Sequence, residues 1–396
     1  MTSERHLLWI IDGDEGYGVR RATLGLATCL CRLGFTFTFV ATRTGPFLDE
    51  LRSAGYTVVS LGRERVRGLE QRGFAYLVAL AHLVTDSFST GLRLLQEVRR
   101  QRPRWIHVHA NRHLLAAALA GRPTGTSVFW HLHNSIRAKL PWGLQAASYR
   151  SICRLCRVVP IANSRHTATT LTRQPSRVQV VHPGVDSSHF SPDAAFPHLH
   201  HHVLGLDPNV PTLLIAARVV PDKAQDRVVD AVIALLSSGM QLSLLIVGGP
   251  VTSPYFHSLL RKVRTAGVDH FIRFLGPTHD PRPYYRLSDF VVNSRLGAEP
   301  YGLTIVEAML MQRPVLAYAA GGPSETIEDG RTGWLIQSPS VTAYQEGINR
   351  ALAARSEWAE MGCYARDRAL RLFSLQESAR AYAAIVEQAP PRPARP

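Results

Sequence analysis

The sequence has 396 residues, of which 45% are hydrophobic and 19% are charged. A chain of this length can build two domains with separate cores, and its composition excludes a disordered protein. No apolar run approaches the roughly eighteen residues that a membrane-spanning helix needs, so no segment is predicted to cross a bilayer as a helix.

The net charge of +15 is spread unevenly along the chain. The first 196 residues hold 25 Lys and Arg against 12 Asp and Glu, whereas the remaining residues hold 20 against 18. An excess of positive charge in one half suggests a face that meets an anionic membrane or an anionic acceptor. A coding bias toward arginine explains the excess equally well, because the only lysines are Lys139, Lys223 and Lys262.

The N-terminus and the cysteines indicate a cellular compartment. The first residues lead directly into an apolar strand pattern and show no secretory signal, and the five cysteines form no paired framework. Both features are typical of a protein in the reducing cytoplasm, where we expect this one to act. Cys153-x-x-Cys156 has no second such pair, so we interpret it as two helix residues rather than a zinc or redox site.

The first half of the chain alternates short apolar strands with helical segments. A helical pattern between 74 and 100 could be interrupted near 87–91, and strands are expected at 7–11, 35–41, 57–61, 105–109, 127–132, 158–162 and 177–181. This βαβ alternation predicts an α/β domain with a doubly wound parallel sheet. In such sheets, ligands bind beyond the carboxyl ends of the strands.

A loop containing glycines follows the first expected strand. Its sequence is DGDEGYG, from Asp12 to Gly18, and a helix is expected after it. A strand, a glycine loop and a helix allow a phosphate to approach the backbone, although Arg21 stands where a dinucleotide fingerprint has its third glycine. Asp12-x-Asp14 looks like a metal-binding pair, but it follows the strand directly and we interpret it as a solvated loop.

Histidines follow two of the expected strands. His133 comes at the end of the 127–132 strand, and His109 and His113 come after the strand before it. Because the carboxyl ends of parallel strands share one edge of a sheet, these side chains could line the same cleft. His131 falls within its strand and is therefore the weaker candidate for a contact with a ligand.

Residues 137–157 form a basic and amphipathic stretch. Its apolar residues include Trp142 and Leu144, and its basic residues include Arg150, Arg154 and Arg157. Such a stretch suits a membrane surface. A helix that packs on its own sheet and leaves its arginines in water is an equally good interpretation.

The second half repeats the alternation after a segment rich in proline and histidine. Strands are expected at 212–216, 242–247, 271–275, 289–293, 313–317 and 333–335, and residues 341–389 have a helical pattern. We therefore predict a first domain over 1–190, a linker over 191–210, a second domain over 211–372, a terminal helix over 373–389 and a disordered tail over 390–396. The histidines of the linker are not predicted to bind a metal.

The stretch LGAEPYGLTIVEAM, from Leu296 to Met309, combines a strand end, a tight loop and a helix start. The N–H groups of Gly302, Leu303 and Thr304 lie at the helix N-terminus, where they can bind a phosphate or another anion. Glu299 is in the loop, and Glu307 follows eight residues later, about one turn into the helix. Carboxylates beside an anion site suit a ligand that has both hydroxyls and phosphates, as a nucleotide sugar does.

This stretch resembles the E-x7-E signature of the retaining glycosyltransferases of family 4. The resemblance implies the GT-B fold, in which two doubly wound parallel-sheet, Rossmann-like domains face each other across a cleft and the last helix crosses back onto the first domain. It also implies that Glu307 holds the nucleotide ribose. By the same resemblance, Glu299 faces the donor sugar as a catalytic residue.

The resemblance extends to residues that would hold the donor diphosphate and the base. Arg218 and Lys223 match the paired cations that neutralise the diphosphate, and fixed cations of this kind can stabilise a leaving diphosphate without a metal. Gly276 matches the place where the base is bound through loop backbone. Gly16 and Gly18 match a paired-glycine loop, from which this sequence departs by the tyrosine between them. We take Gly18 as the glycine that meets the donor phosphates, with Gly16 as the second choice.

Two further motifs match the family in the first domain and at its end. His133, followed by the polar Asn134, matches a histidine that contacts the donor sugar and is taken as the second catalytic residue. The turn Gly184-Val185-Asp186, followed by Phe-x-Pro, resembles the family's signature between the domains.

Together these features predict a metal-independent, retaining glycosyltransferase of bacterial polysaccharide or glycolipid synthesis. Its donor would be a nucleoside-diphosphate sugar, with no other cofactor, and its acceptor could be lipid-linked and presented at the inner face of the plasma membrane. A nucleotide-sugar epimerase or hydrolase of the same fold is the alternative among enzymes. A nucleic-acid-binding protein is disfavoured, because the basic residues are scattered and no aromatic-basic RNA motif is present.

Overall fold

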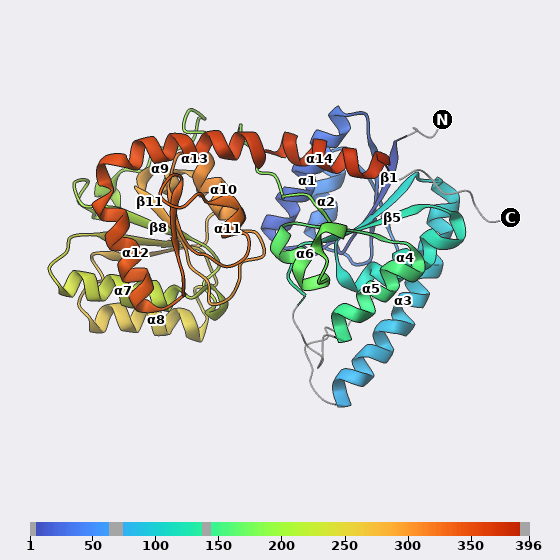
Figure 1. The fold of residues 1–396 in the computed structure, drawn as a ribbon, viewed down its shortest axis with the longest axis horizontal. Helices are drawn as coiled ribbons and strands as arrows, with labels where there is room; N and C mark the ends of the chain where they lie inside the picture. The colour runs from blue at the N-terminus through green and yellow to red at the C-terminus, as the bar shows by residue number, and fades with distance from the viewer. Residues whose placement is uncertain (1–4, 63–73, 137–143, 389–396) are drawn as a thin grey trace. The chain divides into compact units, whose positions relative to one another are not determined.

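The computed structural model describes residues 5–62, 74–136 and 144–388. The chain divides into two compact units, which we call unit 1 (Met1–Gly184 and Leu375–Pro396) and unit 2 (Val185–Ser374). Each unit has one parallel sheet with helices on both faces (Figure 1). Among the described residues, no helix combines the length and the apolar character that crossing a membrane requires.

Unit 1 is built on a seven-stranded sheet in the order β3-β2-β1-β4-β5-β6-β7. Its strands are all parallel: β1 (His6–Ile11), β2 (Thr36–Ala41), β3 (Thr57–Ser60), β4 (Trp105–Val108), β5 (Ser127–Leu132), β6 (Val159–Ala162) and β7 (Gln179–Val180). Their number and places agree with the alternation in the sequence. The helices of unit 1 are α1 (Tyr17–Arg32), α2 (Pro46–Ser53), α3 (Phe74–Gln101), α4 (Leu114–Thr124), α5 (Leu144–Cys156), α6 (Arg165–Leu171) and α14 (Leu375–Gln388), with 3-10 turns η1 (Asn111–His113) and η3 (Pro175–Arg177).

The two faces of the unit 1 sheet are set by the period of two along each strand. On β1, Leu7, Trp9 and Ile11 pack beneath α1, α2 and α14, whereas Leu8 and Ile10 pack against α3, α4 and α6. Both faces are apolar because both are covered, which is the pattern expected of a doubly wound sheet.

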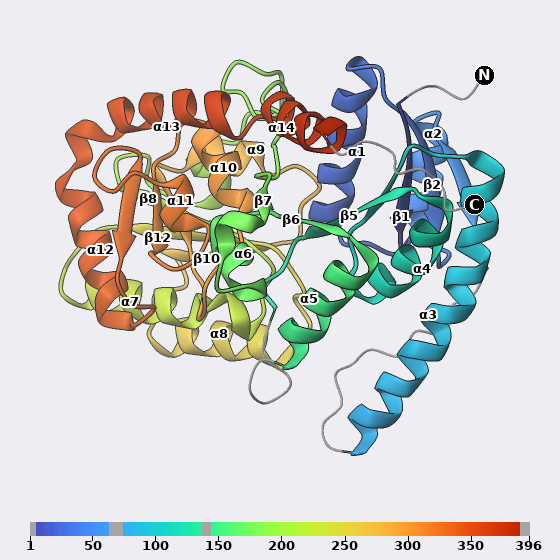
Figure 2. The same cartoon turned by 45° about the vertical axis from the view of Figure 1, so that its right-hand side comes forward.

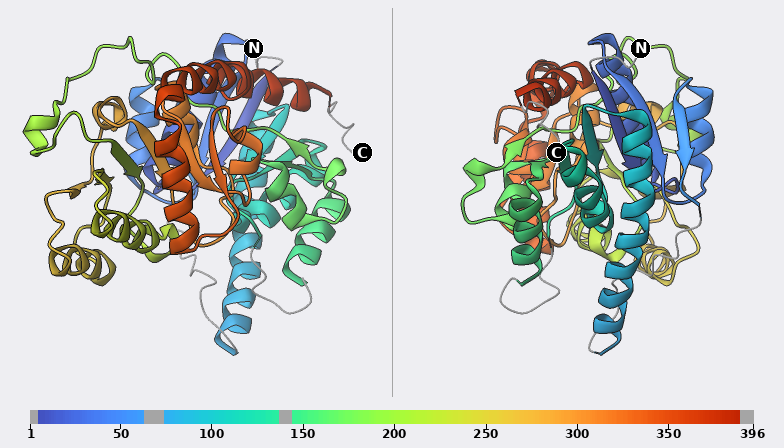
Figure 3. Two further views of the ribbon diagram at one scale, coloured as in Figure 1. Left: turned by 60° about the vertical axis from the view of Figure 1, so that its left-hand side comes forward. Right: turned by 90° about the vertical axis from the view of Figure 1, so that its right-hand side faces the viewer.

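Helix α3 runs without interruption from Phe74 to Gln101 (Figure 2), so the break considered near 87–91 is not present. Gly91 lies within the helix, where a Cβ atom would come 3.3 Å from Leu119 of α4. The glycine allows α3 and α4 to approach closely (Figure 3), and this packing outweighs its low helix propensity.

Unit 2 is built on a six-stranded parallel sheet in the order β10-β9-β8-β11-β12-β13. Its strands are β8 (Thr212–Ala216), β9 (Ser243–Val247), β10 (Ile272–Gly276), β11 (Phe290–Asn293), β12 (Val315–Tyr318) and β13 (Gly333–Ile336). One face packs on α7 (Gln225–Ser237), α8 (Pro254–Thr265) and α12 (Val341–Ala353). The other packs on α9 (Arg282–Leu287), α10 (Leu303–Leu310) and α13 (Trp358–Leu372). The unit also contains α11 (Pro323–Thr326), η4 (His201–Leu204), η5 (Pro221–Lys223) and η6 (Arg355–Glu357).

The chain passes from one unit to the other at two points. It leaves unit 1 after Gly184, a little before the predicted boundary at 190, and residues 191–210 belong to unit 2 rather than to a free linker. Phe190 and Leu206 are buried in the core of unit 2, which explains why this segment is part of it. The chain returns to unit 1 at Leu375.

The predicted helical stretch 341–389 consists of three separate helices, α12, α13 and α14. In unit 1, α14 buries Leu375, Ala379, Tyr382 and Val386 in the same core as α1. Gly25 of α1 lets the two helices pack closely, since a Cβ atom there would come 2.6 Å from Leu375.

Candidate functional site

The loop after β11 is held in place by a pair of glycines. Glu299 forms backbone hydrogen bonds in both directions: its N–H donates to Ala320 at 3.0 Å, and its carbonyl accepts from Gly322 at 2.7 Å. A Cβ atom at Gly321 would lie 2.1 Å from the Glu299 carbonyl oxygen. This close approach requires glycine at position 321. The backbone of residues 320–322 thus holds the backbone of Glu299 in place.

The Glu299 carboxylate is buried between two cations. Its Oε2 atom lies 2.6 Å from Nζ of Lys223, and its Oε1 atom lies 2.8 Å from Nη1 of Arg295. The residue is only 7% exposed, so these contacts are poorly screened by water. Arg295 also reaches Asp222 at 2.9 Å, which makes a network of alternating charges.

The two predicted diphosphate-binding cations lie in the loop between β8 and α7. Arg218 is exposed, and its carbonyl accepts a hydrogen bond from Gln225 at 2.7 Å. Lys223 ends the η5 turn, and its carbonyl accepts from the hydroxyl of Ser294 at 2.6 Å. The structure thus joins the β8 loop to the β11 loop through Lys223, while Arg218 extends into solvent.

The start of α10 has a glycine at its N-cap position, as the predicted anion site requires. Gly302 is its N-cap residue, with φ of +92°, a conformation that favours glycine. A Cβ atom there would also come 2.8 Å from Ile305. The following residues, Leu303 and Thr304, are half-buried, and their N–H groups stand at the positive end of the helix dipole.

Glu307 lies in α10 and is positioned by a tyrosine. It is half-buried, and its Oε2 atom accepts a hydrogen bond from the hydroxyl of Tyr285 at 2.9 Å. Tyr285 is fully buried in α9, which gives this hydroxyl a rigid support. Sequence reasoning missed Tyr285 and Arg295. Arg295 was visible four residues before Glu299, whereas the contact of Tyr285 depends on how α9 packs against α10.

Gly276 ends β10, and backbone contacts link it to the neighbouring loop. It has φ of +73°, and its carbonyl accepts from the N–H of Gly248 at 2.8 Å. A Cβ atom at Gly248 would lie 1.9 Å from the carbonyl of Ala217, just before Arg218. The carboxyl edge of the unit 2 sheet therefore carries every predicted site residue of that unit.

In unit 1, the two predicted glycines lie at the start of α1. Gly16 is the N-cap residue, with open space where a Cβ would be, and Gly18 is in the first turn and exposed. The Glu15 carboxylate accepts hydrogen bonds from the N–H groups of Asp12 at 2.6 Å and Gly13 at 2.8 Å. Burial raises the pKa of Glu15, and these hydrogen bonds oppose that shift. The sequence did not indicate that a carboxylate of the same loop would accept hydrogen bonds from these backbone N–H groups.

The carboxylates of Asp12-x-Asp14 face different cations. Asp12 accepts hydrogen bonds from Arg112 and from His113, the latter at 2.6 Å, while Asp14 pairs with Arg43 at 3.1 Å. Burial alone would raise the pKa of Asp12, but His113 and Arg112 hold it below its ordinary value. Asp14 is exposed, as the interpretation of a solvated loop predicts, whereas Asp12 is largely buried in its contacts and that interpretation is wrong for it.

His133 follows β5 and is in contact with His109. The Nδ1 atom of His109 meets Nε2 of His133, and the backbone carbonyl of His133 accepts from Asn163 at 2.7 Å. Burial lowers the pKa of His133 to about 4, so the ring is neutral at pH 7. His113 is not part of this group, because it is buried against Asp12 and Thr42.

Only part of the amphipathic stretch 137–157 lies within the described residues, since 137–143 fall outside them. Helix α5 packs Tyr149 against Trp130 at 5.1 Å between ring centroids, and it leaves Leu144 and Leu155 exposed. Burial raises the pKa of the Cys153 thiol to about 12, as expected of a structural helix residue. The helix thus has one face on its own sheet and an apolar, basic face outward.

Two family models match the chain, one in each half. Residues 17–189 match the model described as Glycosyltransferase Family 4, and residues 199–368 match the model described as Glycosyl transferases group 1. The second match contains Arg218, Lys223, Glu299 and Glu307.

Curated relatives support the same family. A D-inositol 3-phosphate glycosyltransferase of Gordonia bronchialis is 33% identical over 219 residues, which cover 52% of this chain and 47% of the relative. D-inositol 3-phosphate glycosyltransferase 2 of Catenulispora acidiphila is 30% identical over 226 residues, which cover 53% and 52%. The matched region thus spans about half the length of these relatives.

Solved structures match nearly the whole chain. A glycosyltransferase from Rickettsia africae ESF-5 superposes with a TM-score of 0.81 at 18% identity, covering 97% of this chain and 98% of the other. Anabaena Alr3699/HepE in complex with UDP and glucose superposes with a TM-score of 0.77 at 18% identity, covering 98% and 100%. These likenesses confirm the predicted fold, GT-B, with two Rossmann-like domains.

Proposed function

The chain belongs to glycosyltransferase family 4, and from that membership we propose that it transfers a sugar from a nucleoside-diphosphate sugar to an acceptor with retention of configuration. The observation that carries the proposal is the carboxyl edge of the unit 2 sheet. There, a buried carboxylate between two cations, an open helix N-terminus and a second carboxylate come from the loop after β8, the loop after β11 and helix α10.

Each of these groups has a part in the proposed reaction. The leaving nucleoside diphosphate gains negative charge as the glycosidic bond breaks. Arg218, Lys223 and the N–H groups of Leu303 and Thr304 would stabilise that charge. Glu307, oriented by Tyr285, can accept hydrogen bonds from both ribose hydroxyls, since a carboxylate has two acceptor oxygens.

Glu299 and His133 are proposed to act on the donor sugar. Glu299 is kept anchored by its two cations, so one or both of its oxygens can accept from a sugar hydroxyl without moving. His133 is neutral, so its ring can donate or accept a hydrogen bond without adding a charge. The backbone at Gly16, Gly18 and Gly276 completes the proposed donor contacts.

The donor class is supported by the neighbouring structures, because Anabaena Alr3699/HepE has been solved with UDP and with UDP-glucose. A panel of UDP-, GDP- and ADP-sugars tests the proposal by thermal stabilisation. A ligand at a hundred times its Kd adds about 2.7 kcal/mol to stability. Stabilisation by one nucleotide diphosphate and its sugar is expected, and the absence of any such ligand would contradict the proposal.

Two alternative functions, a nucleotide-sugar epimerase or hydrolase and a nucleic-acid-binding protein, predict different behaviour toward the donor. A nucleotide-sugar epimerase or hydrolase would consume the donor rapidly without an acceptor. A nucleic-acid-binding protein would bind DNA or RNA in a strongly salt-dependent way and would not respond to nucleotide sugars.

The proposed acceptor is lipid-linked and presented at the cytoplasmic face of the membrane, where the enzyme would bind peripherally. The basic excess of the first half and the outward face of α5, with Leu144, Arg154 and Leu155 exposed, support this proposal. Each basic residue near an anionic surface can contribute about 1 kcal/mol. The enzyme would then act in polysaccharide or glycolipid synthesis.

Co-sedimentation with vesicles tests the membrane proposal. Binding should rise with anionic lipid, fall with salt, and drop roughly tenfold when Arg154 and Arg157 become Gln. Arg150 is left unchanged, because its guanidinium donates to the carbonyl of Leu171 at 2.8 Å and supports the fold. The exposed Arg264 of α8, changed to Gln, is the matched control. If the unaltered protein ignores anionic vesicles at low salt, the acceptor is soluble, as the names of the inositol phosphate enzymes suggest for those relatives.

A further inference from the structure

Histidines occupy one face of two neighbouring strands in unit 1. β4 and β5 are parallel and adjacent, and the register pairs His107 with Phe129, two positions before His131. Because side chains alternate between faces, His107, His109 and His131 all point to the same side of the sheet. On that side the adjacent β1 and β2 carry Trp9 and Phe39, so imidazole rings stand where the layer is otherwise aromatic and aliphatic.

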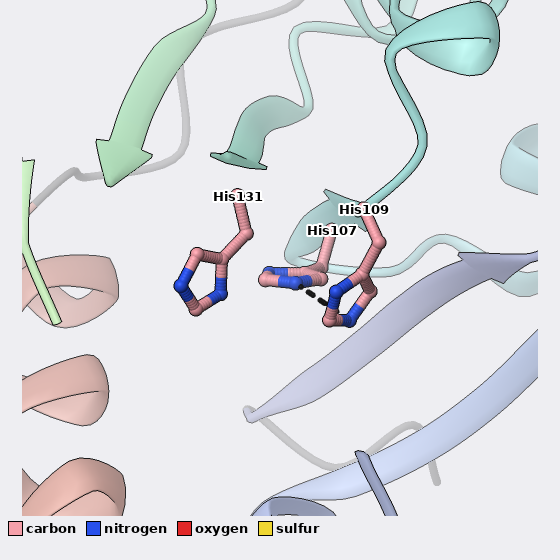
Figure 4. A group of neighbouring side chains, drawn as sticks. All are labelled: His107, His109 and His131. Atoms are coloured by element: carbon pink, nitrogen blue, oxygen red, sulfur yellow. Dashed lines mark hydrogen bonds between the residues drawn. The ribbon is translucent and has the colours of Figure 1, made fainter. Parts of the chain in front are cut away.

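The three rings lie side by side, with His107 between His131 and His109 (Figure 4). Each offers a nitrogen, and the three nitrogens lie within 4.8 Å of one another. The Nε2 atoms of His107 and His109 are 3.2 Å apart. In a tetrahedral zinc site the ligand nitrogens are about 3.3 Å apart, a spacing that His107 and His109 already have and that His131 reaches by moving closer to them.

The outer nitrogens of two rings are already held by other groups. Nδ1 of His107 is 2.6 Å from the hydroxyl of Tyr382, and Nδ1 of His109 meets His133. If both Nδ1 atoms carry the proton and donate outward, the two Nε2 lone pairs face each other. A cation between them satisfies both, and metal-binding histidines commonly donate their other N–H in this way.

His131 gives an independent indication of a ligand. It is 2% exposed, and neither ring nitrogen has a hydrogen-bonding partner of good geometry within the described part of the chain. Leaving a buried polar group without such a partner costs about 1–3 kcal/mol. A proton shared between His107 and His109 would leave that cost in place, whereas a metal ion bound by all three rings gives one of the two His131 nitrogens a partner.

The surroundings of the three rings disfavour a charged imidazolium. Burial lowers the pKa of His107, His109 and His131 well below its ordinary value, and the neighbouring rings add to the effect. For His131 a backbone interaction with Val181, too poor in geometry to count as a hydrogen bond, opposes the shift. Neutral imidazole is the ligand form, and a set of imidazoles without carboxylates suits zinc, cobalt, nickel or copper rather than magnesium or calcium.

We propose that His107, His109 and His131 bind one zinc-class transition metal ion, which ties β4 to β5 inside unit 1 and leaves a fourth position for water. All three proposed ligands lie in unit 1, whereas the donor-site carboxylates Glu299 and Glu307 belong to unit 2. With the ion on Nε2 of His109, the proton of that ring stays on Nδ1 and is donated to Nε2 of His133. His133 then carries its own proton on Nδ1.

The test is a zinc titration in a protein whose row of exposed histidines in unit 2 has been disrupted. His198, His200 and His202 are exposed in unit 2, with ring centroids 6.4 and 5.5 Å apart along the row, and could bind zinc adventitiously. We therefore use His200→Asn/His202→Asn as the background. One equivalent of Zn²⁺ should survive gel filtration, and Co²⁺ should give the visible absorption of a tetrahedral site.

Thermal unfolding provides a second readout. Zn²⁺ at a hundred times its Kd should raise the Tm of the transition that involves unit 1 by about 5 °C or more, and Mg²⁺ should not. His131→Gln and, separately, His109→Gln should lose the equivalent and the Tm shift while keeping the circular dichroism of the parent. The exposed His257, changed to Asn, should keep both. Retention of the full equivalent in both cluster variants, or no retained zinc in the background protein, would overturn the proposal.

Discussion

The carboxyl edges of the two sheets share one architecture but carry different kinds of side chain. In unit 2 the polar residues stand on loops beyond the strands, and they form a network of charges around Glu299. In unit 1 the strands β4 and β5 instead carry histidines, of which His107 and His131 lie within the strands, and burial keeps their rings neutral. The open, charged edge suits a diphosphate, whereas the buried imidazoles suit a metal ion and a neutral contact with a sugar.

The largest expected effect comes from removing the central charge of the unit 2 network. Glu299→Gln should reduce kcat roughly a hundredfold or more, because the proposed contact with the donor sugar is lost and Lys223 and Arg295 face a neutral group. Steady-state kinetics measures this effect, with the exposed Glu346→Gln of α12 as the control. Near-normal kcat in a folded Glu299→Gln enzyme would remove Glu299 from the proposed mechanism.

The next effect concerns donor binding. Lys223→Ala and Glu307→Ala should each weaken the Kd for the nucleotide sugar more than tenfold, which corresponds to about 1.4 kcal/mol. Calorimetric titration of each variant measures it. Lys262 lies in α8, where its Nζ atom is 2.7 Å from the carboxylate of Asp230. Lys262→Ala is therefore the matched control and should bind the donor normally. Equal affinity in all three variants would place the donor elsewhere.

A smaller effect is expected from the residue that positions Glu307. Tyr285→Phe removes one hydrogen bond of 2.9 Å and leaves the ring in its core position. A typical hydrogen bond contributes about 1 kcal/mol, so the donor Kd should rise about fivefold. The change should disappear in the Glu307→Ala background, since the hydroxyl acts through that carboxylate. Additive losses in the double variant would contradict this role.

Unit 1 should respond to acid through Asp12. Its pKa in the folded protein is below the ordinary value, so the unfolded chain binds the proton more readily and the stabilisation is present above that ordinary pKa. It is lost as the pH falls through and below that ordinary value. Asp12→Asn should therefore lower stability at neutral pH and flatten its decline in acid, measured by urea unfolding at several pH values. A decline as steep as that of the parent would show that other groups control it.

The smallest effect is expected from divalent metals on transfer itself. Adding Mg²⁺ or Mn²⁺ to chelated enzyme should leave the rate unchanged, because both oxygens of Glu299 are engaged by cationic side chains. A several-fold recovery with either ion would contradict metal-independent transfer. The proposed zinc site of unit 1 is tested separately, by the zinc content and the thermal stability of the protein rather than by its transfer rate.

The comparison also shows what the sequence could predict. The strands and the start of α10 followed from hydrophobic runs and from glycine, because these signals are local. Glu299 and Glu307 were found through their spacing. The continuity of α3 through Gly91 was not predicted, because it depends on packing against Leu119 of another helix.

The contacts that complete each site depend on tertiary pairing in the same way. Arg295 and Tyr285 meet the two glutamates only when the loops and helices of unit 2 are assembled. The spacing of His107, His109 and His131 was visible in the sequence, but the register of β4 against β5 was not. His131 was judged the weaker candidate because it lies within a strand, and that position is what places it in the cluster.

The central claim is that this chain is a retaining transferase, and the anomeric configuration of its product tests that claim most directly. The enzyme is incubated with the nucleotide sugar that stabilises it and an acceptor that accelerates donor consumption, and the product is examined by NMR. The account predicts that the new glycosidic bond has the anomeric configuration of the donor, and that Glu299→Gln forms the bond at least about a hundredfold more slowly. An inverted product, or donor turnover that no acceptor accelerates, would contradict it.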